Sequence, residues 1–141
     1  MALIHYISSE KLTIQDVQRI VFEDYKLALS EEAQQNIIKC RQYLDDRMAS
    51  QKAPIYGINT GFGSLCNVII NNEDLTTLQE NLVKSHACGL GEEVPQDIVR
   101  IMLLLKIQSL SYGHSGVQLD TVLRLIDFFN NEVYPVVFNQ G

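Results

Sequence analysis

Cysteine, proline and tryptophan are scarce in this sequence of 141 residues, which has three cysteines, three prolines and no tryptophan. The cysteines (Cys40, Cys66 and Cys88) are odd in number and form no Cys-x-x-Cys pair, so neither a disulfide scaffold nor a metal site is predicted. We expect reduced thiols packed as small apolar side chains, in a cytoplasmic protein. No apolar run reaches the roughly 20 residues of a membrane helix, and the first residues do not resemble a signal peptide.

Positive charge is also sparse, with 11 Lys and Arg against 17 Asp and Glu and a net charge of −6. A nucleic-acid-binding surface needs clustered Lys and Arg, so neither nucleic acid nor membrane is expected as a partner. The sequence has no repeat, low-complexity stretch or charge block. Since 46% of its residues are hydrophobic, we expect a single domain over residues 1–141 with its own core.

The apolar spacing predicts a mainly α-helical fold with at most two short strands near the N-terminus. Residues 4–7 and 25–29 could form these strands. Between them, Thr13 and Asp16 resemble a capping box that starts a helix. Further helices are expected from Ser30 to before Pro54, from residues 72–74 to Gly89, from 95 to 111 and from 117 to about 130, the last one capped by Ser115.

The predicted helix at 95–111 is apolar nearly all round, which implies burial on every side. The chain also ends on an apolar segment, VYPVVFNQG, although termini are usually polar and loose. These features favour a chain that is part of something longer or that docks onto a partner. The alternative is a tail that folds back on its own core.

Residues 53–72 are predicted to form a long loop, and loops of that length are usually functional or disordered. Its glycines follow neither the Gly-x-Gly-x-x-Gly nor the Walker spacing, so the residues alone favour a tight turn anchored by Tyr56 and Phe62. His86 alone is typical of a packed or capping histidine at a helix C-terminus. His114 and Ser115 do not form a Gly-x-Ser-x-Gly nucleophile elbow.

Four segments in this order carry a more specific signal: YGINTGFGSL, LQENLVKSHACGLGEEVP, VRIMLLLKIQSLSYGHSGV and NEVYPVVFNQG. Together they resemble the N-terminal region of the aromatic amino acid ammonia-lyases, and most closely its histidine-specific members. The resemblance covers nearly the whole chain and is strongest from Tyr56 onward. It implies the mainly α-helical fold of that family's N-terminal part.

The resemblance also implies roles for individual residues. Tyr56 would be the catalytic base or proton-handling residue, and a tyrosine needs nearby positive charge or hydrogen bonds to ionise near neutral pH. Ser85 and His86 would bind and sort the substrate, since a polar pair suits an imidazole ring. The active-site loop would comprise Gly57, Asn59, Thr60, Gly61, Phe62 and Gly63.

In the family, the segment after the counterpart of Gly141 contains an Ala-Ser-Gly that cyclises into the methylidene-imidazolone (MIO) electrophile. The resemblance therefore predicts deamination of L-histidine to trans-urocanate and ammonia in a homotetramer, without a metal. The chain by itself ends before the MIO segment and is expected to be inactive. The alternatives are a tyrosine ammonia-lyase or aminomutase of the same family, and a non-catalytic helical module that binds a full-length lyase subunit.

Overall fold

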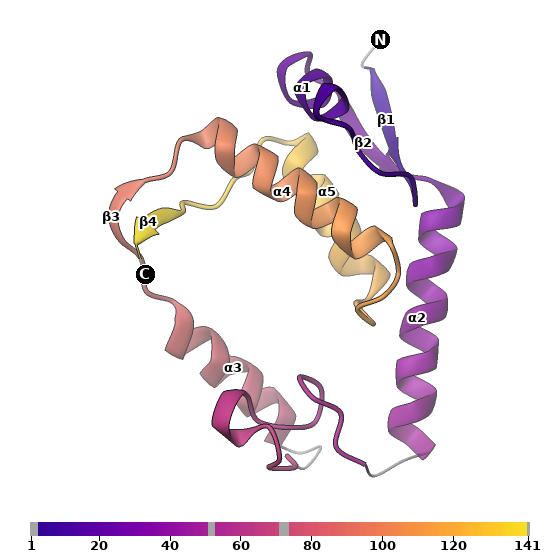
Figure 1. Cartoon of the computed structure of the whole chain (residues 1–141), viewed down its shortest axis with the longest axis vertical. Coiled ribbons are helices and arrows are strands. Elements are labelled where there is room, and N and C mark those ends of the chain that lie inside the picture. Colours follow the sequence, from indigo (N-terminus) through magenta and orange to yellow (C-terminus); the bar gives the residue numbers. More distant parts are fainter. Residues whose placement is uncertain (1–2, 51–52, 71–73, 141) are drawn as a thin grey trace.

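The structure is a computed structural model that describes residues 3–50, 53–70 and 74–140. The predicted helical fold is confirmed, and Figure 1 shows how its elements are arranged. In chain order these are β1 (Ile4–Ile7), α1 (Ile14–Phe22), β2 (Lys26–Leu29), α2 (Glu31–Ser50), the 3-10 turn η1 (Gly63–Leu65), α3 (Leu75–His86), β3 (Leu90–Glu93), α4 (Gln96–Ser111), α5 (Leu119–Asn130) and β4 (Phe138–Gln140).

The two predicted N-terminal strands form a parallel pair, with Ile4 opposite Lys26 and Ile7 opposite Leu29. A parallel pair needs a crossover, and α1 supplies it. The predicted capping box at the start of α1 is confirmed. The Thr13 hydroxyl accepts the Asp16 N–H at 3.1 Å, and the Asp16 carboxylate accepts the Thr13 N–H at 3.0 Å.

The core lies where α4 and α5 pack together and against α1, α2 and β2. Its buried side chains come from every one of these elements and from β1, so one hydrophobic core joins the N-terminal and C-terminal thirds of the chain. They are led by Phe129, Ile7, Ile20, Ile37, Leu104, Ile107 and Val122.

Helix α4 buries one face and leaves another exposed. Val99, Leu104 and Ile107 are buried, but Ile98, Met102 and Leu105 are 45–48% exposed. Burial of this helix on every side, which its sequence predicts, is therefore not reached within this chain. The exposed stripe is a surface that another protein segment could cover.

Two helix ends differ from the prediction. Helix α5 begins at Leu119 with Gln118 as its N-cap, so the predicted Ser115 cap is wrong. Gly116 has a φ of +69°, which breaks helical geometry just after Ser115 and moves the start downstream. Helix α3 ends at His86, before Gly89. Its predicted first residues, Asn72 and Glu73, lie outside the described residues.

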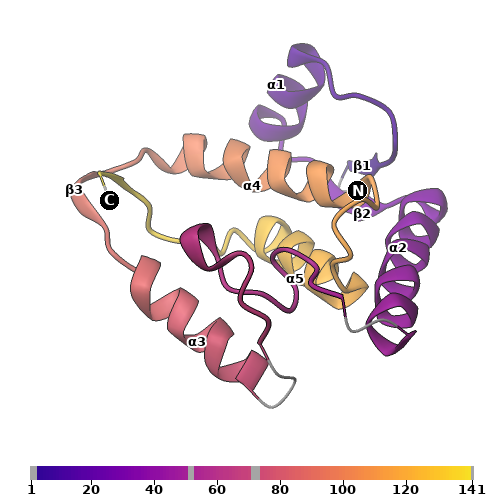
Figure 2. The ribbon, with the colours of Figure 1, turned by 60° about the horizontal axis from the view of Figure 1, so that its bottom comes forward.

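The strands β3 and β4 come in addition to the two strands that the sequence predicts near the N-terminus. They pair antiparallel, with Leu90 opposite Gln140 and Glu93 opposite Phe138, and the register shifts between these pairs. The apolar tail thus folds back in part: Tyr134 packs against the core, whereas Val136 stays 64% exposed. Figures 1 and 2 show that this pair connects the helical core to α3, which lies apart from it.

Candidate active site

The loop that carries Tyr56 is held in shape by Asn59. This buried side chain accepts the Ile55 N–H through Oδ1 at 2.7 Å and donates Nδ2 to the Ala53 carbonyl at 3.3 Å. Asn and Asp favour such turns because their side chains replace backbone partners. The loop therefore has an internal scaffold, and Tyr56 lies on the turn that Asn59 closes.

The rest of the loop closes on itself through backbone hydrogen bonds. Thr60, which is fully buried, forms a bridge with Ile69, and the Gly61 N–H donates to the Val68 carbonyl at 3.1 Å. The Thr60 hydroxyl donates to the Gly61 carbonyl at 3.0 Å. Gly57 has a φ of +76°, a value that other residues rarely adopt.

Tyr56 itself is 64% exposed and lies edge-to-face with Phe62, with ring centroids 6.1 Å apart. The two rings do contact each other, as the tight-turn interpretation predicts, but Tyr56 is not a buried anchor. Its phenol borders an open pocket of about 480 Å³ that is also lined by Pro54, Gly63, Cys66 and Asn67. The Tyr56 side chain is therefore accessible to a molecule outside the chain.

Ser85 and His86 lie at the C-terminal end of α3, and both are exposed. The His86 Nδ1 is 3.0 Å from the Leu82 carbonyl and 3.0 Å from the Ser85 hydroxyl. The Ser85 hydroxyl also donates to the Leu82 carbonyl at 3.0 Å. Because a carbonyl only accepts, these contacts favour a proton on Nδ1, and the neutral ring then presents Nε2 as an acceptor.

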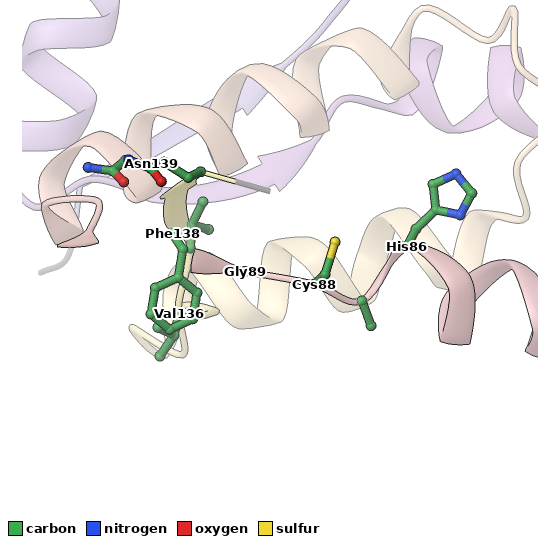
Figure 3. A pocket seen from close by; sticks show the side chains of 9 residues that line it. His86, Cys88, Gly89, Val136, Phe138 and Asn139 are labelled. Atoms are coloured by element: carbon green, nitrogen blue, oxygen red, sulfur yellow. The ribbon is translucent and has the colours of Figure 1, made fainter. Parts of the chain in front are cut away.

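This geometry agrees with the capping interpretation of His86 and leaves its other nitrogen available to a ligand. His86 lines a pocket of about 620 Å³ whose two walls are His86–Gly89 and Val136–Gln140 (Figure 3). The sequence does not predict the second wall, since no local pattern links it to His86. Tyr56 and His86 line separate pockets in this chain.

The cysteines do not all behave as small apolar residues. Cys40 and Cys66 are half-buried free thiols, as that interpretation predicts, whereas Cys88 is exposed in the wall of the His86 pocket. Over the described ranges, no three His, Cys, Asp or Glu side chains gather closely enough to bind a metal ion. None of the helices in the described part of the chain has the length and apolar character needed to cross a bilayer.

A family model for aromatic amino acid lyases matches residues 12–141. This chain belongs to the aromatic amino acid lyase family. It is 42% identical to histidine ammonia-lyase from Clostridium tetani over 135 residues, which are 96% of this chain and 26% of that protein. Histidine ammonia-lyase from Streptococcus pyogenes is 40% identical over the same shares. The chain thus spans about a quarter of the length of the curated relatives it matches.

Solved structures of the lyase family agree with this assignment. Histidine ammonia-lyase from Trypanosoma cruzi superposes with a TM-score of 0.85 at 32% identity, over 99% of this chain and 26% of that one. Ergothionase from Treponema denticola gives a TM-score of 0.90 at 27% identity, over 98% of this chain and 28% of that one. The predicted resemblance to the N-terminal part of the lyase fold is confirmed.

Proposed function

We propose that this chain is the N-terminal part of a histidine ammonia-lyase and carries its proton-accepting tyrosine and its substrate-sorting pair. The accessible phenol of Tyr56, on a loop fixed by Asn59, is the observation that carries the proposal. The identity of about 40% to histidine ammonia-lyases supports histidine as the substrate. Residues 1–141 would form a domain that ends just before the MIO-forming segment.

The proposed reaction breaks the Cβ–H and Cα–N bonds of L-histidine and forms an O–H bond and a carbon–carbon double bond. Tyr56 Oη, in its ionised form, accepts the β-proton, and the ammonium group leaves as ammonia with the electron pair of the carbon–nitrogen bond, which gives trans-urocanate. The β-proton is barely acidic and the amine is a poor leaving group, so an electrophile is required as well as a base.

The MIO group of the family supplies that electrophile. The sequence of this chain contains no Ala-Ser-Gly tripeptide, so the group must form on another segment. The residues present fit such an arrangement, because the Tyr56 phenol lies at an open pocket and not inside a closed interior. Alone, this chain is proposed to be inactive.

Ser85 and His86 would bind the substrate ring. The free Nε2 of a neutral His86 can accept the N–H of a substrate imidazole, and this requires the Nδ1-protonated form that the Leu82 carbonyl favours. A tyrosine hydroxyl could donate to the same nitrogen, so the preference for histidine over the tyrosine lyase or aminomutase alternative rests on the identity of about 40% to histidine ammonia-lyases.

The assembly proposed for the complete enzyme is a cytoplasmic homotetramer with active sites between subunits. The exposed stripe of Ile98, Met102 and Leu105 on α4 gives such an assembly an apolar surface to bury. The odd number of cysteines favours a reducing compartment.

The proposal is tested by joining residues 1–141 to the remaining part of the C. tetani histidine ammonia-lyase and following urocanate absorbance after histidine is added. Tyr56→Phe should lower turnover about 10²–10⁴-fold, the scale of a general base. Tyr43→Phe is the matched control, because Tyr43 is 62% exposed on α2 and should not affect turnover. A folded, assembled fusion without histidine-dependent urocanate, or a Tyr56→Phe variant with normal turnover, would overturn the proposal.

A second comparison tests the sorting pair. Replacing Ser85 and His86 with alanine should reduce the preference of the fusion for histidine over tyrosine. Glu80→Ala is the control, since Glu80 lies one and a half turns earlier on the exposed surface of α3 and its ion pair with Lys84 is long at 3.8 Å. An unchanged preference in the double variant would remove the assignment of these two residues.

A further inference from the structure

We propose that Gly89 and Phe138 form a positioning contact that holds His86 in place at its pocket. This inference rests on the proposed role of His86 in substrate binding. Both residues line this pocket, and we assign them a positioning role: they would act through His86, by fixing the distance between the two walls of the pocket shown in Figure 3.

The contact leaves no room for a side chain at position 89 while the Phe138 ring stays where it is. A Cβ atom built on Gly89 would lie 2.3 Å from Cδ2 of Phe138 and 3.1 Å from its Cγ. Atoms do not approach so closely, so the ring or its strand would have to move. Gly89 does not have a positive φ, and an alanine there therefore tests space alone and introduces no backbone strain.

The link from Gly89 to His86 is short and hydrogen-bonded. The Ala87 N–H donates to the Val83 carbonyl at 2.9 Å, and the Cys88 N–H donates to the His86 carbonyl at 2.9 Å. These bonds leave the three-residue connection little freedom. A displacement at Gly89 is therefore transmitted to the end of α3.

Helix α3 has little else to hold it. None of the α3 side chains that the structure describes belongs to the hydrophobic core, and Val83 is 68% exposed. Its C-terminal end is instead tied through β3 to β4, where the Val94 N–H donates to the Val137 carbonyl at 2.7 Å. The position of this end of α3 therefore depends on how closely β3 and β4 approach each other. The Gly89–Phe138 contact limits that approach.

Kinetics of the fusion enzyme provide the first test. Gly89→Ala should lower kcat/KM for histidine by about 10²-fold, the scale for a group displaced by roughly 1 Å, and mainly through a higher KM. In a Phe138→Ala background, which removes the ring, Gly89→Ala should change kcat/KM by no more than about twofold. Leu90→Ala, an exposed neighbour on β3, is the control for general disturbance of the strand.

Two kinetic results would overturn the inference. One is a Gly89→Ala effect of equal size with and without the Phe138 ring. The other is an unchanged KM in Gly89→Ala, even if its unfolding temperature falls, because the contact would then be purely structural.

A second test needs no activity and uses the 141-residue chain. The ring signals of His5, His86 and His114 are followed by NMR, and His86 is assigned through His86→Gln. Gly89→Ala should move the His86 signal and leave those of His5 and His114 in place, and it should have no effect in the Phe138→Ala background. A His86 signal that stays in place would overturn the inference.

The two tests separate this inference from the proposed function. If the unmodified fusion makes no urocanate, the proposed function fails, while the NMR comparison still decides whether Gly89 and Phe138 position His86. If the fusion is active and Gly89→Ala changes neither KM nor the His86 signal, only the positioning contact fails.

Discussion

The side chain of Asn130 pairs with the backbone of Leu27 as a neighbouring strand would. Its Oδ1 accepts the Leu27 N–H at 2.7 Å, and its Nδ2 donates to the Leu27 carbonyl at 2.9 Å. Leu27 lies in β2, whose other edge pairs with β1. Asn130 at the end of α5 thus satisfies backbone groups that would otherwise be unpaired at a buried residue.

Asn130→Ala should therefore destabilise the chain by about 1–3 kcal/mol, the cost of leaving a buried donor or acceptor without a partner. Urea unfolding of the 141-residue chain measures the loss. Asn131→Ala is the matched control, because the Asn131 side chain donates to the Asp127 carbonyl, at 2.8 Å and in an exposed position. Its loss should stay within about 0.5 kcal/mol. Equal losses in the two variants would contradict the assignment.

Gly113 and Gly116 offer a second matched pair, on the turn between α4 and α5. Both have positive φ, +72° and +69°. An added Cβ would meet the backbone oxygen of Asn36 at 2.6 Å in the first case and the flexible Cδ2 of Leu44 at 2.7 Å in the second.

Both alanine variants should lose the roughly 1–2 kcal/mol that a left-handed conformation costs a residue with a side chain. Gly113→Ala should lose about 1–3 kcal/mol more, because the α2 backbone cannot move aside as the end of Leu44 can. Thermal or urea unfolding gives both values. The explanation fails if Gly116→Ala is as damaging as Gly113→Ala.

The capping box of α1 makes a prediction about pH. The Thr13 hydroxyl, at 2.7 Å, and then the Thr13 N–H hold the pKa of Asp16 below its ordinary value, and Arg19 contributes less. The ionised carboxylate is the form favoured in the folded chain. The stability it contributes is thus present above the ordinary pKa of 3.8 and is lost as the pH falls through the lower pKa of the folded state.

A carbon NMR titration of the Asp16 carboxyl group checks this. Thr13→Ala should move its midpoint upward toward the ordinary value, because both the hydroxyl bond and the local geometry of the cap are lost. Ser9→Ala removes a different exposed hydroxyl, which donates to Glu32 at 2.6 Å, and should leave the Asp16 midpoint where it was. An Asp16 midpoint unaffected by Thr13→Ala would contradict the role of the cap.

The elements that could be predicted from the sequence are those fixed by neighbours in the chain. The start of α1 follows from Thr13 and Asp16, three residues apart, and β1 follows from a short apolar run. The bond between Asn130 and Leu27 joins residues 103 positions apart, and the β3–β4 pair has no alternating pattern to indicate it. Such contacts depend on the whole fold, so a local pattern does not contain them.

In the candidate site, too, the local features could be predicted from the sequence and the long-range contacts could not. From the residues alone, the Tyr56 loop and His86 indicate a turn and a helix cap, and the structure contains both features. Only the family resemblance predicts that the same residues have roles in catalysis and substrate binding. The opposite wall of the His86 pocket could not be found from sequence, because it comes from a tail that reaches α3 through β3.

His5 supplies a last prediction, again on pH. Burial in β1 lowers the pKa of His5 below its ordinary value of 6.5, while the nearby Asp16 opposes this shift and Arg19 adds to it. The folded chain thus resists a proton that the unfolded chain accepts. Stability should be full above pH 6.5 and fall as the pH decreases through the lower pKa of the folded state.

NMR titration of the His5 ring should therefore give a lower midpoint in the folded chain than in the same chain unfolded in urea. Asp16→Asn should lower the folded midpoint further, because it removes the negative charge that stabilises the protonated ring. His5→Gln should reduce the loss of unfolding free energy between about pH 7 and pH 5. Identical His5 midpoints in the folded and unfolded chains would show that burial does not act on this ring.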